Sequence, residues 1–293
     1  MNGVVIIDKP QGLTSHDVVN RVRRILGQRS VGHLGTLDPS ATGVLPIVVG
    51  NFTRLAQFYA QSEKKYEGVI RFGFSTTTYD ADGEAVGLVQ HVVLQAEEVH
   101  ALAEKFRGVL QQTPPPFSAK KIAGVPAYRL ARKREIVALK PVEVEIKEFS
   151  ILNVEGDRAG FRAHVSSGTY LRSIAHEMGE RLGCGAHLAE LRRTAVAEFA
   201  VEESHTLDEL DLAARQGTVE EIMVHPRKLL PLMPCVTATE ENVALIRTGR
   251  AVNLPELSRA PKVKVLYGQR ELVAIASRIA GTLFHASIVF AGE

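Results

Sequence analysis

One short stretch, Gly32 to Gly43, constrains the fold of this chain more than any other part of the sequence. It holds three glycines and a proline within twelve residues, so we expect neither a helix nor a regular strand there. The apolar run that follows, residues 44–49, predicts a buried strand. An irregular loop supported by a core strand can hold one carboxylate, that of Asp38, in a fixed position. The pattern alone also fits an ordinary turn in which Asp38 bonds its own backbone.

The balance of charge over the whole chain says little about partners, because the formal net charge is only +2. Local charge says more. Residues 105–134 contain eight Lys or Arg and no Asp or Glu, and three consecutive prolines interrupt them. Such a run attracts a polyanion, and nucleic acid fits better than a membrane because no amphipathic helix carries the charges. We expect a long loop or clamp that orders on its partner; a solvated basic surface is the alternative.

The cysteines and the N-terminus argue against several classes of protein. Cys184 and Cys235 are far apart and match no paired spacing, so neither a disulfide framework nor a zinc site is indicated. Cys184 and His187 alone do not complete a metal site. The first apolar run, residues 4–7, is too short for a signal sequence, and no apolar run approaches the roughly 18 residues of a membrane span. We therefore expect a cytoplasmic protein with no metal and no membrane partner.

The N-terminal part carries clear local signals. Residues 4–7 predict a buried strand. Thr14 or Ser15 can cap a helix that has Asp17 in its first turn, where a carboxylate favours the helix dipole. Apolar residues then recur on one face, and Gly27 marks the end of the helix.

Further elements are predicted through the middle of the chain. A strand is expected around Tyr66, at 64–72, and a surface helix at 97–106. Residues 142–146 and 161–165 alternate between apolar and polar side chains, as strands do.

A second helix is predicted after a polar turn. Thr169 is the expected N-cap, and an apolar stripe continues to Gly183, where the helix ends. Arg172 lies in the first turn away from that stripe, so the pattern alone also fits a solvated arginine. Leu191, further on, would by itself be assigned to the core.

The composition changes after a proline-rich linker at 230–234. The short β segments beyond it include a hairpin candidate whose turn lies at 268–269, and they predict a small barrel. We therefore expect two domains, 1–231 and 235–293, with the basic insertion at about 105–134.

Seven short motifs, in order along nearly the full length of the chain, are specific as a set although each one alone is weak. They are Asp8-Lys9-Pro10-x-Gly12-x-Thr14-Ser15, Gly32-His33-x-Gly35-x-Leu37-Asp38-Pro39-x-Ala41-Thr42-Gly43, Lys65-Tyr66, Asp80-x-Asp82-Gly83, Pro115-Pro116-x-Ser118-Ala119-x-Lys121, Gly168-Thr169-Tyr170-x-Arg172 and Leu188-x-x-Leu191-Arg192-Arg193. In these motifs the chain resembles the TruB family of tRNA pseudouridine-55 synthases.

The resemblance implies an α+β fold in which a large mixed, mainly antiparallel sheet with flanking helices carries a cleft across its middle. It also implies that the C-terminal barrel is a PUA-like RNA-binding module, for which a structural cap is the alternative. The implied reaction isomerises a uridine in the T-arm of tRNA: the bond from uracil N1 to ribose breaks, the base turns, and C5 bonds to the same sugar carbon. This chemistry requires no metal and no other cofactor.

The resemblance also assigns catalytic roles. Asp38 corresponds to the nucleophile, which can attack and later depart. Three routes are open to it: addition to the sugar, addition to the uracil ring, or assistance in elimination to a glycal. Arg172 matches the arginine that holds this carboxylate, and Asp80 matches a second acid in the same network, so we expect the three to lie together. Tyr66 matches the active-site tyrosine, which stacks on the target base and is also a candidate for proton removal. Stacking is the favoured role because an unaided phenol is a poor base.

Other matched residues are implied to bind the substrate. Tyr170 and Leu191 resemble residues lining the uracil pocket, and His33 the residue that fills the space vacated by flipped nucleotides. By itself, His33 would more often be a plain loop histidine. Lys9 is expected to support the active-site loop without necessarily touching RNA.

Extruding the target base costs a few kcal/mol, and one aromatic stack returns roughly 1–3 kcal/mol, so contacts to the RNA backbone must contribute. We expect these contacts from the basic insertion. The candidate residues are Lys120, Lys121, Arg129, Arg132 and Lys133.

Two alternatives to a stand-alone enzyme remain at this level. One is a non-catalytic RNA binder or tRNA-folding chaperone on the same scaffold, against which the intact Asp38, Tyr66 and Arg172 argue. The other is the related guide-dependent synthase of archaeal and eukaryotic ribonucleoproteins, against which the long basic insertion argues. We expect a monomer that needs no guide RNA. No glycine-rich nucleotide-binding pattern is present.

Overall fold

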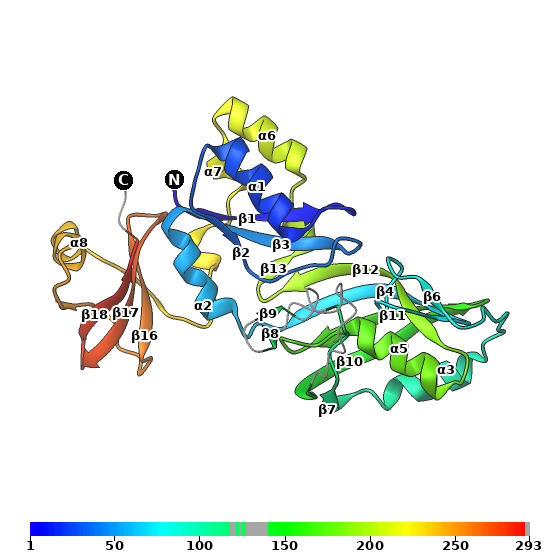
Figure 1. The fold of residues 1–293 in the computed structure, drawn as a ribbon. Coiled ribbons are helices and arrows are strands. Elements are labelled where there is room, and N and C mark those ends of the chain that lie inside the picture. The colour runs from blue at the N-terminus through cyan, green and yellow to red at the C-terminus, as the bar shows by residue number, and fades with distance from the viewer. Residues whose placement is uncertain (118–120, 123–124, 127–139, 291–293) are drawn as a thin grey trace.

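The computed structural model describes residues 1–117, 121–122, 125–126 and 140–290. A large sheet and a smaller C-terminal sheet organise the chain (Figure 1). The large sheet has nine strands: β1 (Gly3–Lys9), β2 (Val31–His33), β3 (Thr42–Val49), β4 (Lys64–Phe72), β7 (Gly108–Gln112), β10 (Val142–Glu155), β11 (Arg158–Val165), β12 (Ala186–Val196) and β13 (Phe199–Ala200).

The order in the large sheet is β1-β3-β12-β4-β11-β10-β7, with β2 added to β3 and β13 to β12. Every neighbouring pair is antiparallel except β3 and β12, which run parallel. The expected mixed, mainly antiparallel sheet is confirmed. β12 is therefore the strand that joins the N-terminal part of the sheet to the strands from the middle of the chain.

Helices cover this sheet at two places (Figure 1). They are α1 (Ser15–Leu26), α2 (Ala56–Tyr59), α3 (Ala96–Glu104), α5 (Leu171–Arg181), α6 (Leu207–Gln216) and α7 (Val219–Ile222). Helices α1 and α6 pack over β1 and β3, while α3 and α5 pack against the strands around β10 and β11. Short 3-10 turns lie at Gly50–Leu55, Val201–Glu203 and Pro226–Lys228. None of the helices in the described ranges is both long and apolar enough to span a bilayer.

Helix α1 begins and ends where local chemistry predicts. The hydroxyl of Thr14 accepts a hydrogen bond from the backbone N–H of Asp17, and the Asp17 carboxylate accepts one from the N–H of Thr14. This capping box satisfies two donors that a helix start otherwise leaves open. Gly27 follows the last turn at φ 62°, the left-handed conformation that glycine adopts at low cost.

Helix α5 departs from the expectation at its first residue. The N-cap is Tyr170, not Thr169, and no side chain of the helix caps it. A glutamine from β7 instead holds the backbone of this N-cap residue: Gln112 Oε1 accepts from the N–H of Tyr170 at 2.8 Å, and Gln112 Nε2 donates to the carbonyl of Tyr170 at 3.1 Å. A partner this distant in sequence leaves no local signal.

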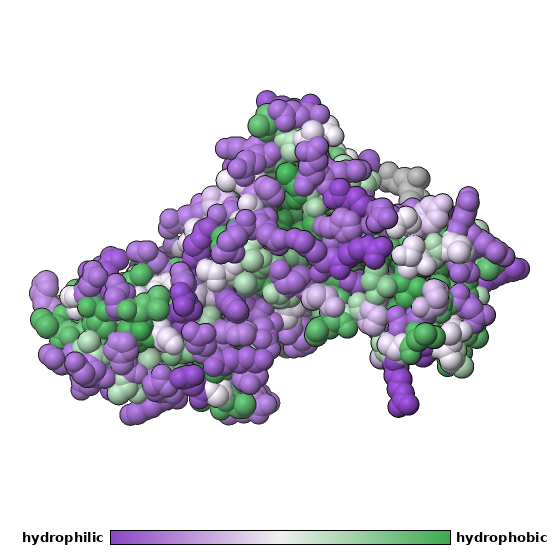
Figure 2. Space-filling model, turned by 180° about the vertical axis from the view of Figure 1, so that it is seen from behind, coloured by the Kyte–Doolittle hydropathy of each residue, from purple (hydrophilic) through white to green (hydrophobic). Residues whose placement is uncertain are grey.

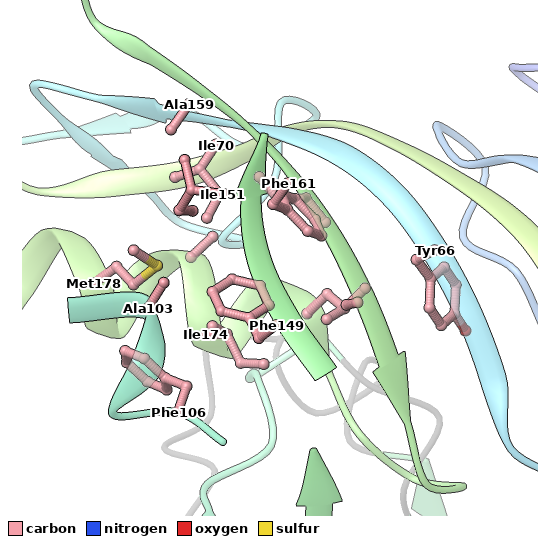
Figure 3. Close-up of a cluster of buried hydrophobic side chains, with 14 of the residues drawn as sticks. Tyr66, Ile70, Ala103, Phe106, Phe149, Ile151, Ala159, Phe161, Ile174 and Met178 are labelled. Atoms are coloured by element: carbon pink, nitrogen blue, oxygen red, sulfur yellow. The ribbon is translucent and has the colours of Figure 1, made fainter. Parts of the chain in front are cut away.

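The largest core cluster lies between β4, β10, β11 and helices α3 and α5. Figure 3 shows Phe149, Phe161 and Ile174 within it, and Tyr66 at one end of the cluster, apart from them. The active-site candidate Tyr66 is therefore buried at the edge of this core cluster. Seen from behind, mainly hydrophilic residues cover the surface (Figure 2).

The C-terminal strands curl into a half-barrel with α8 (Glu240–Arg247) beside it (Figure 1). In spatial order they are β14 (Cys235–Thr237), β16 (Lys262–Tyr267), β17 (Glu271–Ala280), β18 (Leu283–Val289) and β15 (Val252–Asn253). The predicted hairpin is β16–β17. Phe290 packs edge-on against Phe52, with 5.0 Å between ring centroids, so the two sheets share a core.

Two further strand pairs are small. They are β5 (Ser75–Thr76) with β6 (Ala85–Val86) and β8 (Lys121–Ile122) with β9 (Val125–Pro126). The first pair encloses a polar turn, and Asp80 lies in that turn.

Candidate active site

The loop that carries Asp38 connects β2 to β3 and is held from below by the first motif of the chain. The side chain of Ser15 accepts from the N–H of Leu37 at 2.9 Å and donates to its carbonyl at 3.1 Å. The carbonyl of Pro39 accepts from the N–H of Gly12 at 2.9 Å and from Lys9 Nζ at 3.1 Å. Residues on both sides of Asp38 are thus fixed to the segment between β1 and α1.

Lys9 lies under the loop with its side chain fully buried. Besides Pro39, its ammonium donates to the carbonyls of Pro10 at 2.9 Å and Leu13 at 2.7 Å. Burial lowers the pKa of Lys9 to about 8, although the charge of Asp38 works in the opposite direction. Its three carbonyl partners give Lys9 the supporting position that was expected for it.

Arg172, at the start of α5, connects two carboxylates. Its Nε lies 3.1 Å from Asp38 Oδ2, and its Nη1 lies 3.1 Å from Asp80 Oδ2. Nη1 also donates to the carbonyl of Thr78 at 3.1 Å, and Nη2 donates to the carbonyl of Phe117 at 3.0 Å. With 7% of its side chain exposed, this arginine is a fixed part of the site and not the solvated residue that the helical pattern alone allows.

Asp80 is held from its own loop as well. Thr78 Oγ1 donates to Asp80 Oδ1 at 2.5 Å, and the N–H of Asp82 donates to the same oxygen at 3.1 Å. The loop joins the large sheet through a parallel bridge between Asp80 and Leu188 of β12. Three segments that lie far apart in sequence therefore place Asp38, Asp80 and Arg172 together.

A cavity of about 450 Å³ opens at this network. The carboxylate Asp38 and the base-binding candidates His33, Tyr66, Tyr170 and Leu191 line it together with Arg172. Asp80 lies on the other side of Arg172, in a small recess that Asp38 also borders. The cavity brings a carboxylate, a guanidinium and a phenol ring within reach of one small planar ligand.

The environment of Asp38 opposes its ionisation. Burial raises the pKa of its carboxyl, the Arg172 guanidinium lowers it, and the negative charges of Asp80 and Asp82 raise it further. About 40% of the side-chain surface is open, but it opens into the cavity, so the walls still remove water from around the carboxylate. The arginine is therefore needed to keep the carboxylate charged.

Comparison with known proteins decides the family. Residues 23–171 match the model of the TruB family pseudouridylate synthase N-terminal domain, and residues 172–243 match that of the tRNA pseudouridylate synthase B C-terminal domain. The chain belongs to the TruB family. It is thus a pseudouridine synthase, an isomerase acting in tRNA modification.

Individual relatives agree with this membership in the TruB family. The tRNA pseudouridine synthase B of Solibacter usitatus is 49% identical over 292 residues, covering 99% of this chain and all of the relative. The protein of the same name from Thermobifida fusca is 50% identical over 217 residues, 71% of this chain and 74% of that one. Among solved structures, the archaeal box H/ACA sRNP Nop10–Cbf5 complex contains a chain that is 25% identical, with a TM-score of 0.71 over 99% of this chain and 86% of that one.

His33 ends β2 and faces the cavity of the TruB site. Its Nδ1 is buried and has no hydrogen-bond partner among the described residues. Burial lowers the pKa of His33, and the nearby charge of Arg193 lowers it further. The imidazole of His33 is therefore mainly neutral at pH 7 and forms part of the cavity wall.

Arg193, the last residue of the seventh motif, also lines the cavity of the TruB site, although no role was expected for it from the sequence. Its side chain is fully buried on β12 between Gly43 of β3 and Tyr66 of β4, its partners in the register. It donates to two loop carbonyls, those of Gly35 at 3.0 Å and Thr36 at 3.1 Å, and to the carbonyl of Val44 in β3 at 2.8 Å. Arg193 therefore holds the loop that carries the nucleophile candidate against β12.

Arg193 also reaches the Tyr66 phenol. Burial lowers the pKa of Arg193, and a side-chain hydrogen bond with Tyr66 together with the charge interaction works against this. One sequence signal could have identified it: Leu191 was expected to line the pocket, and the residue two positions on in a strand shares its face.

The candidates for contacts to the RNA backbone have no described side chain. Lys120, Arg129, Arg132 and Lys133 lie outside the described residues, and of Lys121 only the backbone, in β8, is described. The carbonyl of Phe117, just before this segment, is bonded by Arg172. Arg172 thus bonds the basic insertion of this TruB chain at Phe117, the last residue described before the gap.

The His, Cys, Asp and Glu side chains of this TruB chain are the possible ligands of a metal ion. Within the ranges that the structure describes, no three His, Cys, Asp or Glu side chains gather as a metal site would require. Cys184 and Cys235 are both free thiols.

Proposed function

We propose that this chain is a tRNA pseudouridine-55 synthase that uses Asp38 as its nucleophile. The observation that carries the proposal is the ion pair between Arg172 Nε and Asp38 Oδ2 in a cavity that Tyr66 also lines. Relatives that share the full length of the chain bear the name tRNA pseudouridine synthase B, which supports a tRNA substrate.

The roles follow from the chemistry of the reaction. The N1–C1′ bond breaks, C5 bonds to C1′, C5 loses its hydrogen and N1 gains one, so atoms balance without a redox change. Asp38 divides this exchange into two steps by bonding and then leaving. Arg172 keeps Asp38 ionised and oriented, and Asp80 fixes the arginine from its other side.

Base binding is assigned to the rest of the cavity. Tyr66 stacks on the uracil, Tyr170 and Leu191 enclose it, and His33 occupies the space from which nucleotides have turned out. Phosphates contact the basic insertion, with Lys120, Lys121, Arg129, Arg132 and Lys133 as candidates.

Isotope release tests the proposal, because uridine and pseudouridine have equal mass. A T-arm hairpin with tritium on C5 of uridine 55 is incubated with the protein and no guide RNA. We expect tritium in the water, and none when the label is on a neighbouring uridine. Asp38→Asn is expected to lower the rate at least ~10³-fold and to change hairpin affinity only a few-fold.

Three outcomes would contradict the proposal. Turnover by Asp38→Asn would exclude Asp38 as the nucleophile. Release that requires a guide RNA would favour a guide-dependent enzyme, and hairpin binding without release by the wild type would favour a chaperone.

The organisation of the molecule is part of the proposal. We infer a catalytic domain at 1–231 and an RNA-binding domain at 235–293, working as a monomer in the cytoplasm. The two separate sheets support the division. Sedimentation of the purified chain alone and with the hairpin tests the monomer, since one chain per hairpin is expected.

A further inference from the structure

Lys64 is a cation of the active-site cavity to which no role has been given. It begins β4, and strand geometry places alternate residues on opposite faces. Lys64 and Tyr66 accordingly both line the cavity, whereas Lys65 between them is exposed. The ammonium of Lys64 is thus carried into the cavity by the same strand that carries Tyr66.

The surroundings of Lys64 are positive on one side. A Cβ atom placed on Gly35 would lie 3.8 Å from Lys64 Cε and 3.7 Å from Arg193 Nη1, so both cationic side chains border the space beside Gly35 that a side chain there would fill. Lys64 Nζ donates to the carbonyl of Ser62 at 2.6 Å. Of the ion pairs between described residues, none includes Lys64.

Holding an ammonium half-buried beside a guanidinium has a cost that an anion in the cavity would offset. Burial, with the charge of Arg193 as a second cause, lowers the pKa of Lys64 to about 8. Asp38 supplies negative charge in the same cavity, but Arg172 already holds it.

We propose that Lys64 binds a phosphate of the RNA strand next to the flipped uridine. The inference rests on the proposed function, because a nucleotide turned into this cavity brings its own phosphates to the rim. A phosphate is the anion that such a strand carries at every nucleotide, and an ammonium contacts it as a point charge.

The first test is the salt dependence of binding to a T-arm hairpin, measured with full-length protein between 50 and 200 mM NaCl. Each phosphate contact contributes about 0.7–0.9 to the slope of log affinity against log salt. We expect Lys64→Gln to reduce the slope by about this amount and to weaken binding about tenfold or more at low salt. Lys65→Gln, the matched control on the opposite face, is expected to change affinity less than about twofold.

The second test is pH. The titratable and charged groups that share the cavity with Lys64 are His33, Asp38, Tyr59, Tyr66, Tyr170, Arg172 and Arg193. Lys9, beneath the loop, also has a pKa of about 8. Since only the protonated amine binds phosphate well, wild-type affinity should decline as the pH rises above 8. Lys64→Arg keeps its charge and should abolish this decline, whereas a decline caused by Lys9 would persist in that variant.

Catalysis gives a third readout that separates binding from folding. Lys64→Gln should raise KM for the hairpin and leave kcat within a few-fold, because the contact persists from ground state to transition state. A melting curve close to that of the wild type would show that the variant is folded. If Lys64→Gln fails to fold, the pH profile of Lys64→Arg still decides.

The outcomes distinguish the two proposals. Equal slopes for Lys64→Gln and Lys65→Gln, or the same alkaline decline in Lys64→Arg as in the wild type, would overturn the phosphate contact. Absence of tritium release from the wild type would instead contradict the proposed function, and the binding experiments would still report on Lys64.

Discussion

The ring of Tyr79 lies parallel to the imidazole of His176, with 3.8 Å between centroids and 7° between planes. Tyr79 precedes Asp80 and has a φ of 65°, which is unusual for a residue with a side chain. His176 lies one turn after Arg172 on α5. The stack therefore fixes the Asp80 loop to the same helix that supplies the arginine, beside the ion pair itself.

Removal of this stack is expected to slow catalysis without touching the substrate. Tyr79→Ala and His176→Ala should each lower kcat about tenfold, because Asp80 then holds Arg172 less firmly and small displacements of reacting groups are costly. Tyr79→Phe keeps the ring and should stay near the wild type. Single-turnover rates on the labelled hairpin measure the effect.

A double-mutant cycle shows whether the two rings act as a unit. The combination of Tyr79→Ala and His176→Ala should cost little more than either change alone, with a coupling energy of about 1–1.5 kcal/mol. Fully additive effects would mean that the stack does not position the loop.

Adjacent arginines on β12 provide a matched pair. Arg193→Met removes the donor to three backbone carbonyls and should lower the free energy of unfolding by about 3 kcal/mol or more, with loss of activity. Arg192 pairs with Asp8 at 2.7 Å but has 42% of its side chain exposed, so Arg192→Met should cost less than about 1 kcal/mol. Urea denaturation of both variants compares them, and equal costs would contradict the assigned role of Arg193.

Gly43 and Gly12 allow the effect of a steric clash on stability to be distinguished from the effect of backbone strain. A Cβ on Gly43 would lie 2.2 Å from the carbonyl oxygen of Arg193, and the residue has a φ of 100°. Gly12 has a φ of 86° but nothing within 4 Å of its Cβ position. Gly12→Ala should therefore cost only the strain, about 1–2 kcal/mol, and Gly43→Ala clearly more. Thermal melts test this. Similar decreases in melting temperature for the two variants would show that β12 can move away from residue 43 at little cost.

Local chemistry explains which parts of this fold the sequence could predict. Thr14, Asp17 and Gly27 act on neighbours within a few positions, so the bounds of α1 follow from the pattern. The interval 64–72 was predicted as a strand, and β4 occupies the same residues. Thr169 failed as an N-cap because Gln112, 58 positions from Tyr170, bonds the start of α5.

The site required more than local pattern. Arg172 looks solvated on a helical projection, and its burial comes from Asp38, Asp80 and the Phe117 carbonyl, which tertiary structure alone brings together. Family motifs supplied roles for Asp38 and Arg172. Arg193 ends the last motif but received no role, and Lys64 lies in none of the motifs. Strand alternation connects these two residues to the cavity through their neighbours Leu191 and Tyr66, whose pocket positions must be known first.

The ionisation of Asp38 should cost stability at neutral pH. Below the unfolded value of 3.8 the carboxyl is protonated in both states and contributes nothing. Because burial raises its folded pKa, the folded state holds the proton longer than the unfolded state as pH rises. The free energy of unfolding therefore falls between the two pKa values and stays lower above both.

Asp38→Asn should accordingly melt at a higher temperature than the wild type at pH 7, by about 2–4 °C for each kcal/mol relieved, and the difference should shrink as pH falls towards 3.8. Asp157→Asn is the control of opposite sign: the hydrogen bond with Arg71 lowers the pKa of the half-exposed Asp157, so its loss should leave the melting temperature equal or lower. Calorimetry at pH 4, 5.5 and 7 measures both. A lower melting temperature for Asp38→Asn at pH 7 would contradict this prediction. It would mean that the ion pair with Arg172 stabilises the folded state by more than the burial of the charged carboxylate destabilises it.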